Sequence, residues 1–148
     1  MSSNSMEPNF RGLGFREDLA LLLLRVASGP VFLYHGSAIL LGWFGGPGVE
    51  RFAAAHHWPL VIALLVGLAQ LSGGLAILSG IMFRVGAGSV SIVMLGAILL
   101  VHLRNGFNVS NGGFEYALTQ LLIAVALLLT GPGKFSLLPF SPGWLRRL

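Results

Sequence analysis

Long apolar runs separated by short polar segments dominate this chain. Four runs, at residues 19–41, 58–78, 85–103 and 116–129, contain Arg25 as their only formally charged side chain. An α-helix rises about 1.5 Å per residue and the hydrocarbon core of a bilayer is about 30 Å thick, so these runs approach the length of a crossing. Because backbone polar groups in hydrocarbon must be paired within their own segment, helices are favoured. The pattern predicts an all-α, integral membrane four-helix bundle.

The polar stretches divide the chain into three parts. Residues 1–18 are a polar N-terminal segment, in which residues 1–5 could precede the native start. Residues 19–133 form the expected transmembrane domain, and residues 134–148 form an interfacial tail that we expect on the cytoplasmic leaflet. Between the first two runs, residues 49–57 are expected to form a short surface helix.

The basic residues near the ends of the runs indicate an orientation. If the N-terminus is cytoplasmic, the inner side holds six Lys and Arg residues and the outer side holds two. The inner six are Arg11, Arg16, Arg84, Lys134, Arg146 and Arg147, and the outer two are Arg51 and Arg104. Because loops rich in Lys and Arg stay in the cytoplasm, we predict that both termini are cytoplasmic.

The composition agrees with a membrane protein and excludes several chemistries. Of the 148 residues, 55% are hydrophobic and only 9% are charged, unlike an average soluble domain. The formal net charge of +4 is interpreted as a topology signal and lipid contact, with no nucleic-acid partner. The chain contains no cysteine, which excludes disulfides, thiol chemistry, iron–sulfur clusters and Cys-ligated zinc within it.

The predicted topology gathers ionisable side chains toward the outer face. His35 and His102 lie near the outer ends of the first and third runs, His56 and His57 precede the second, and Glu115 precedes the fourth. Three interpretations stay open. Histidine and glutamate can exchange protons with a quinone, the pair His35 and His102 could ligate a metal or haem, or these side chains serve packing and solvation. Metal or haem ligation is the least favoured, and we expect no metal site.

Two polar residues lie deeper in the predicted membrane region. An unpaired guanidinium in hydrocarbon costs at least about 2.5–3.5 kcal/mol. Arg25 is therefore expected either to extend back to the inner headgroups or to face the bundle, against Ser28 or Gln70, where it could bind an anionic or carbonyl ligand. Gln70 is expected to hydrogen-bond another helix. The candidate ligand-binding residues are Arg25, His35, Gln70, His102 and Glu115, and no catalytic residue is assigned.

Small residues are expected to let the helices pack closely. They are Gly67, Gly73 and Gly74 in the second run, and Gly86, Gly88, Ser91 and Gly96 in the third.

Several motifs resemble those of the DoxX family. They are Arg25-x3-Gly29, Phe32-x2-His35-Gly36, the loop Gly-Trp-Phe-Gly-Gly-Pro-Gly at 42–48, Gly-Gly-Phe-Glu-Tyr at 112–116, and Gly-Pro-Gly-Lys-Phe-Ser-Leu at 131–137. The resemblance implies a multi-pass, four-helix protein of the bacterial inner (plasma) membrane, associated with redox complexes and quinones. This chain departs from the family pattern at Ile39, Gln70 and Leu138, where the resemblance implies Lys, Glu and Asp.

These features together favour an accessory role in membrane redox chemistry. The leading hypothesis is a DoxX-like integral membrane subunit of a redox or electron-transfer complex, contributing helix packing and a quinone- or lipid-contacting surface. The expected partners are the lipid bilayer, a larger membrane protein complex and a quinone. A stand-alone quinone-dependent oxidoreductase and a small permease or scaffold remain as alternatives.

Overall fold

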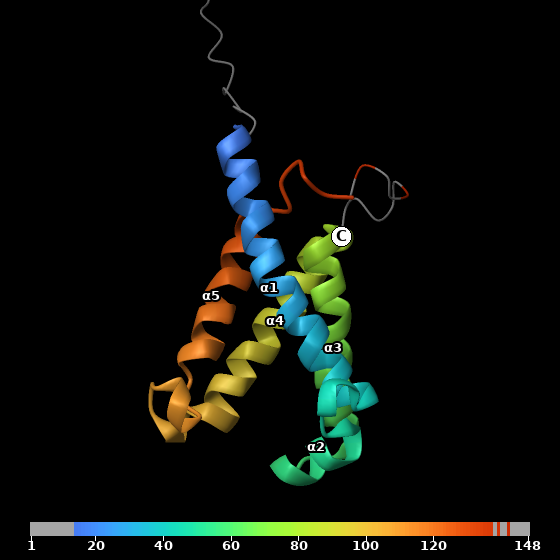
Figure 1. The fold of residues 1–148 in the computed structure, drawn as a ribbon, viewed down its shortest axis with the longest axis vertical. Coiled ribbons are helices and arrows are strands. Elements are labelled where there is room, and N and C mark those ends of the chain that lie inside the picture. Colours follow the sequence, from blue (N-terminus) through green and yellow to red (C-terminus); the bar gives the residue numbers. More distant parts are fainter. Residues whose placement is uncertain (1–13, 138, 140–141, 143–148) are drawn as a thin grey trace, which may run out of the picture.

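The computed structural model describes residues 14–137, 139 and 142, and within this part of the chain every regular element is helical. The longer helices are α1 (Phe15–Leu41), α2 (Gly48–His56), α3 (Leu60–Ser79), α4 (Phe83–Gly96) and α5 (Glu115–Thr130) (Figure 1). The short elements are η1 (Trp43–Gly45), η2 (Ala97–His102), η3 (Leu103–Asn105) and η4 (Val109–Asn111). The all-α prediction is confirmed, and α2 is the expected short helix before the second run.

Within the described residues, three helices are long and apolar enough to cross a membrane: Phe15–Leu41, Leu60–Ser79 and the continuous stretch Phe83–Asn105. The chain is therefore a multi-pass membrane protein in contact with lipid. Helix α5 is apolar but has 16 residues, or about 24 Å at 1.5 Å per residue. This is less than a full crossing of about 30 Å, so a fourth crossing stays a prediction.

The assembly formed by the described helices has two ends that differ in structure. After α5 the chain returns to the start of α1, where the backbone N–H of Lys134 donates to Asp18 Oδ1 at 3.0 Å. We call this the Asp18 end, and the opposite one, where α2 and the last turn of η2 lie, the His102 end. The helices spread apart toward the His102 end (Figure 1). Which end faces the cytoplasm stays a prediction.

The first helix begins earlier than its apolar pattern indicated. Helix α1 starts at Phe15, and it includes Asp18, whose side chain is only 3% exposed. The carboxylate is compensated locally, because it accepts the Lys134 backbone N–H and its Oδ2 lies 3.6 Å from Lys134 Nζ. A negative charge in the first turn is also stabilised by the positive end of the helix dipole. The rest of the polar N-terminal segment, residues 1–13, lies outside the described residues. So do residues 138, 140–141 and 143–148 of the tail.

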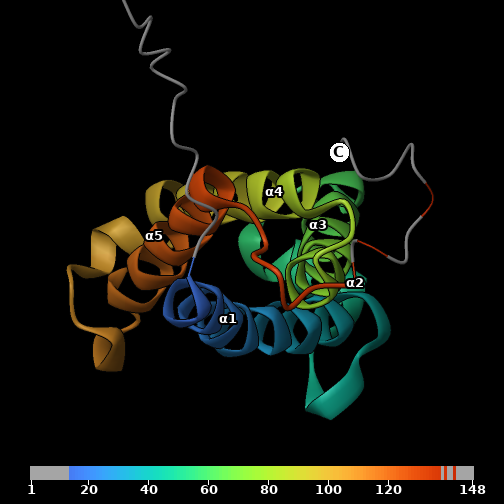
Figure 2. The ribbon, with the colours of Figure 1, turned by 90° about the horizontal axis from the view of Figure 1, so that it is seen from above.

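Glycines allow close helix packing at part of the predicted positions. Viewed along the bundle (Figure 2), α4 lies across from α1, with α3 and α5 on either side. A Cβ atom on Gly74 of α3 would lie 2.8 Å from the Gly29 oxygen of α1, and one on Gly73 would lie 3.1 Å from the Gly86 oxygen of α4. No described atom comes within 4 Å of a Cβ on Gly88 or Gly96. The packing prediction is confirmed for Gly73, Gly74 and Gly86 and is wrong for Gly88 and Gly96.

Candidate functional site: a cavity between the helices

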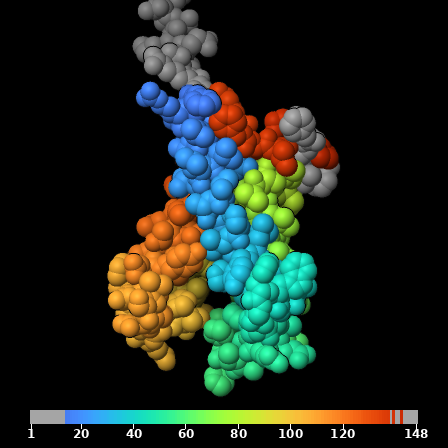
Figure 3. Space-filling view, in the orientation of Figure 1, coloured from blue at the N-terminus to red at the C-terminus, as the bar shows by residue number. Residues whose placement is uncertain are grey.

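A cavity of about 670 Å³ lies between the two groups of helices at the His102 end. In the space-filling view the molecule is hollowed between the part that carries α2 and the part that carries the chain between α4 and α5 (Figure 3). Most of the lining is aliphatic or aromatic, with Phe32, Ile39, Leu65, Val93 and Leu100 as examples. Small-molecule sites between helices have this size and apolar character.

The polar part of the lining comes from six different elements. It consists of His35 (α1), His56 (α2), Gln70 (α3), Ser89 (α4), His102 (η2), and Tyr116 and Gln120 (α5). No Asp, Glu, Lys or Arg is among the described residues that form the wall. Because a charged ligand buried in such a wall would find no counter-charge, the cavity suits a neutral molecule.

Three of the five candidate residues named from the sequence meet in this cavity. His35, Gln70 and His102 all line it, although they lie far apart in the sequence and on three different elements. Ile39 lines it too. Ile39 and Gln70 are positions where the family resemblance implies charged residues, so both departures affect the same wall and leave it neutral.

His102 is held in a defined orientation by the loop before α5. Its Nδ1 lies 2.7 Å from the Gly112 carbonyl oxygen, which also accepts from Asn105 Nδ2 at 3.1 Å. A carbonyl oxygen can only accept, so Nδ1 carries the proton and donates. In the neutral ring Nε2 is then the acceptor, left for another partner.

The helix that carries His102 is irregular where it lines the cavity. Residues Ala97–His102 form a π-helix, in which hydrogen bonds span five residues rather than four. Ala97, Leu100, Val101 and His102 all contribute to the lining. Such stretches are rare and occur often at functional sites. The apolar sequence of this segment gave no sign of it.

The Gln70 side chain is mostly buried, and its amide opens on the cavity without a protein partner. It is 6% exposed, and no hydrogen bond joins its side-chain amide to another residue that the structure describes. The expectation that Gln70 bonds to a neighbouring helix is therefore wrong. A Cβ on Gly36 would lie 2.7 Å from Leu71 Cα. The helices α1 and α3 therefore cross closely at Gly36 and Leu71. The residues that immediately precede these two, His35 and Gln70, lie at the same level of the cavity.

Gln120 and Tyr116 are lining residues that were not among the sequence candidates. Ser28 Oγ donates to Gln120 Oε1 at 2.9 Å, and the Gln120 side chain lies close to the Tyr116 hydroxyl. The sequence could have indicated them, because Tyr116 and Gln120 are four residues apart and therefore place two polar side chains on one face of an apolar helix.

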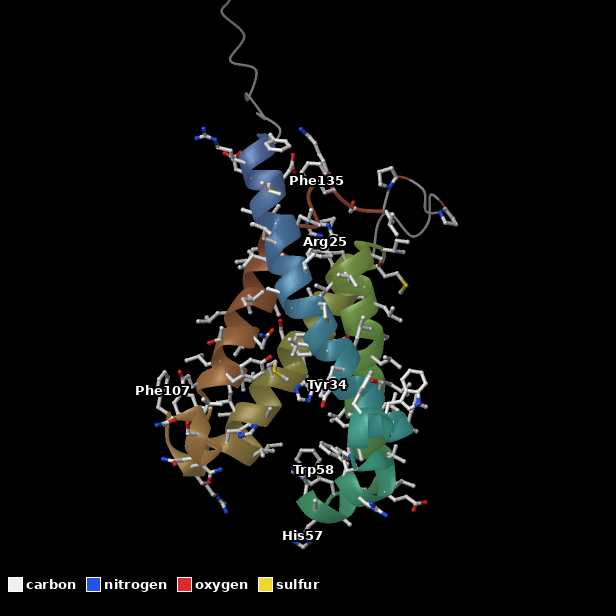
Figure 4. All side chains as sticks on the ribbon, in the orientation of Figure 1. Arg25, Tyr34, His57, Trp58, Phe107 and Phe135 are labelled. Carbon is white, nitrogen blue, oxygen red and sulfur yellow. The ribbon has the colours of Figure 1, made fainter. Side chains whose placement is uncertain are left out.

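Aromatic side chains form the rim near α2. The His56 ring lies 4.5 Å from that of Phe52 and 4.8 Å from that of Trp58, and all three line the cavity. His57 is exposed and outside the lining, and it points away from the hollow toward which Trp58 is turned (Figure 4). The adjacent histidines therefore have different surroundings.

Glu115 lies outside the cavity wall. Its Oε2 accepts the backbone N–H of Val109 at 3.0 Å, and its own N–H donates to the Phe107 oxygen at 2.9 Å. As the first residue of α5 it also faces the positive end of that helix dipole. These contacts fold the loop that holds the Gly112 carbonyl against His102.

Arg25 is also outside the cavity wall, and it joins three segments at the Asp18 end. It is 1% exposed. Nε donates to the Ile77 oxygen at 2.7 Å, Nη2 to Leu78 at 2.5 Å, and Nη1 to Pro132 and Phe135 at 3.0 and 2.6 Å. Arg25 and Phe135 lie together in Figure 4. The guanidinium therefore binds backbone carbonyls rather than extending to the headgroups, and it contacts neither Ser28 nor Gln70 among the described hydrogen bonds.

No group of three or more His, Cys, Asp or Glu side chains is placed to hold a metal ion within the described part of the chain.

Comparisons with known proteins agree with the membrane fold and the sequence motifs. The DoxX family model matches residues 20–103, which is more than half of the chain. A curated relative from Bacillus subtilis (strain 168), "Putative oxidoreductase CatD", is 32% identical over 123 residues, which cover 83% of this chain and 87% of the relative. No solved structure matches. The chain belongs to the DoxX family.

Proposed function

We propose that this protein is a subunit of a bacterial inner-membrane redox complex and that its cavity binds a quinone. The observation that carries the proposal is a neutral, mainly apolar cavity whose few polar groups include three imidazoles and one phenol. A quinone is a flat apolar ring with carbonyl acceptors, and its isoprenoid tail requires an apolar exit. The name of the curated relative, an oxidoreductase, supports redox chemistry.

The polar groups suit the proton part of quinone chemistry. Reduction of a quinone to a quinol takes up two electrons and two protons. When protonated, His102 can donate from Nε2 to a quinone oxygen; when neutral, the same atom can accept a proton from a quinol. The Gly112 carbonyl keeps the proton on Nδ1 in both states. The Tyr116 hydroxyl is a second donor on the same wall.

The electrons are proposed to come from a partner protein. The chain has no cysteine, so it offers neither a redox-active thiol nor the usual ligands of an iron–sulfur cluster. A partner subunit that carries a redox cofactor would supply electrons at the membrane surface. The alternative is a stand-alone quinone-dependent oxidoreductase, which the name of the relative favours.

Copurification tests this proposal. We expect the protein, extracted from its native membrane in a mild detergent, to retain quinone at near one molecule per chain and to migrate with larger partners. His102→Leu should retain about tenfold less, the loss expected for one hydrogen bond. His57→Ala is the control, because His57 is exposed and outside the cavity. The proposal would be refuted if the purified parent protein carried no more quinone than the co-extracted lipid alone accounts for. A lone chain that reduces quinone with a soluble donor would favour the stand-alone enzyme.

A further inference from the structure

Gln70 is the most unusual polar group of the membrane region. It is 6% exposed, lines the cavity and has no hydrogen-bond partner among the described residues. It lies ten residues after Leu60, or about 15 Å from the start of α3 at 1.5 Å per residue. This is about half the thickness of a hydrocarbon core. Among the described residues no fully buried side-chain N or O atom lacks a partner, so the Gln70 amide is open to the cavity, where a ligand can supply the hydrogen bond that polar groups at this depth nearly always make.

We infer that the amide of Gln70 is the anchor of the ligand and binds one of its ring oxygens in both redox states. This inference rests on the proposed quinone site and names the contact that fixes the ring there. The wall around Gln70 contributes no charge, so the contact is a neutral hydrogen bond. The recognised ligand class is a lipophilic ring with an oxygen that either accepts or donates a hydrogen bond.

An amide is suited to a ligand that changes its hydrogen-bonding character. The NH2 group of Gln70 can donate to the carbonyl of an oxidised quinone, and its carbonyl oxygen can accept from the hydroxyl of the quinol. A rotation of the amide interchanges the two, and no charge enters the membrane. A carboxylate has no donor for the carbonyl of the oxidised form, and an ammonium has no acceptor for the hydroxyl of the quinol.

Gln120 does not have the same freedom. Its Oε1 already accepts from Ser28 at 2.9 Å, and its side chain lies close to the Tyr116 hydroxyl. The two buried glutamines therefore differ in role: Gln120 joins α1 to α5, whereas Gln70 remains available. His35 lies on the adjacent helix α1 at the same level as Gln70 and lines the same cavity, so it is a second polar group within this part of the wall.

Paired ligands test the anchor. The probes are an alkylated 1,4-naphthoquinone and the naphthalene with the same alkyl chain, added to protein in lipid nanodiscs. Trp58 lines the cavity, so quenching of its fluorescence reports binding, with Trp58→Phe as the background for partition into lipid. We expect Gln70→Met, which keeps the shape but removes the amide, to weaken the naphthoquinone about tenfold and leave the naphthalene unchanged. Ser72→Ala, on the same helix but exposed and bonded to Leu68, should change neither.

Stability measurements separate an anchor from a packing residue. Because no described side chain or backbone group pairs with Gln70, Gln70→Met should leave the unfolding temperature of the ligand-free protein unchanged or raise it. Ser28→Ala, which removes a bond to Gln120, should lower it. Equal naphthoquinone affinity in the parent and in Gln70→Met, or a large loss of ligand-free stability, would overturn the anchor. If the parent does not bind the naphthoquinone at all, the quinone site itself fails.

Discussion

The role of Arg25 can be tested directly, because a stabilising contact and a ligand contact predict opposite results. Four hydrogen bonds join its guanidinium to backbone carbonyls of residues 77, 78, 132 and 135. Hydrogen bonds to a charged group contribute about 1.5–3 kcal/mol each, or about 6–12 kcal/mol if they were additive. Desolvation of the guanidinium offsets several kcal/mol of this sum. We therefore expect Arg25→Leu to lower the free energy of unfolding by about 3–5 kcal/mol.

The assay is equilibrium unfolding in mixed micelles, followed by circular dichroism as the fraction of SDS rises. Arg25→Lys should recover about half of the loss, because an ammonium has three donors on one atom and cannot reproduce the planar fork. Ser72→Ala is the control, because this exposed side chain bonds to the Leu68 oxygen of its own helix and surface substitutions usually change stability by no more than about 0.5 kcal/mol. An Arg25→Leu protein within about 1 kcal/mol of the parent but unable to bind quinone would refute the stabilising role and restore Arg25 as a ligand residue.

Three further predictions concern packing and the loops. Gly74→Ala should lower the free energy of unfolding by about 1–3 kcal/mol, because the added Cβ would lie 2.8 Å from backbone atoms of α1. Gly88→Ala is the control: there is open space around Gly88, so the same unfolding assay should show no change. Glu115→Ala should speed hydrogen exchange at the Val109 amide, which loses its acceptor; unchanged exchange would contradict the contact. Asp18→Ala should increase proteolysis just after α5, because it removes the acceptor of the backbone N–H there; parental cleavage rates would argue against this tie.

The cavity shows how much of the site was predictable. Sequence reasoning selected His35, Gln70 and His102 because polar side chains in apolar runs are rare and costly, and this reason holds for any fold that buries them. It also selected Arg25 on the same ground, and Glu115 because it precedes the fourth run near the predicted outer face. It could not show that these two bind backbone groups outside the cavity, because the carbonyls that bind Arg25 come from segments up to 110 residues away and the N–H that binds Glu115 depends on the fold of the loop before α5.

The sequence by itself determined the helical, membrane-embedded character of the chain, because the requirement to pair every backbone group in hydrocarbon depends only on local composition. It also determined the family, through motifs that are contiguous. Only the tertiary structure decided which polar groups were already satisfied. Arg25 and Gln70 look alike in the sequence, as single polar residues in apolar runs, but packing gives the first four carbonyl partners and leaves the second facing a cavity without one. The physical reason is that a hydrogen bond requires its two atoms within about 3 Å, and the helix crossings that bring them together depend on contacts between distant residues such as Gly36 and Leu71.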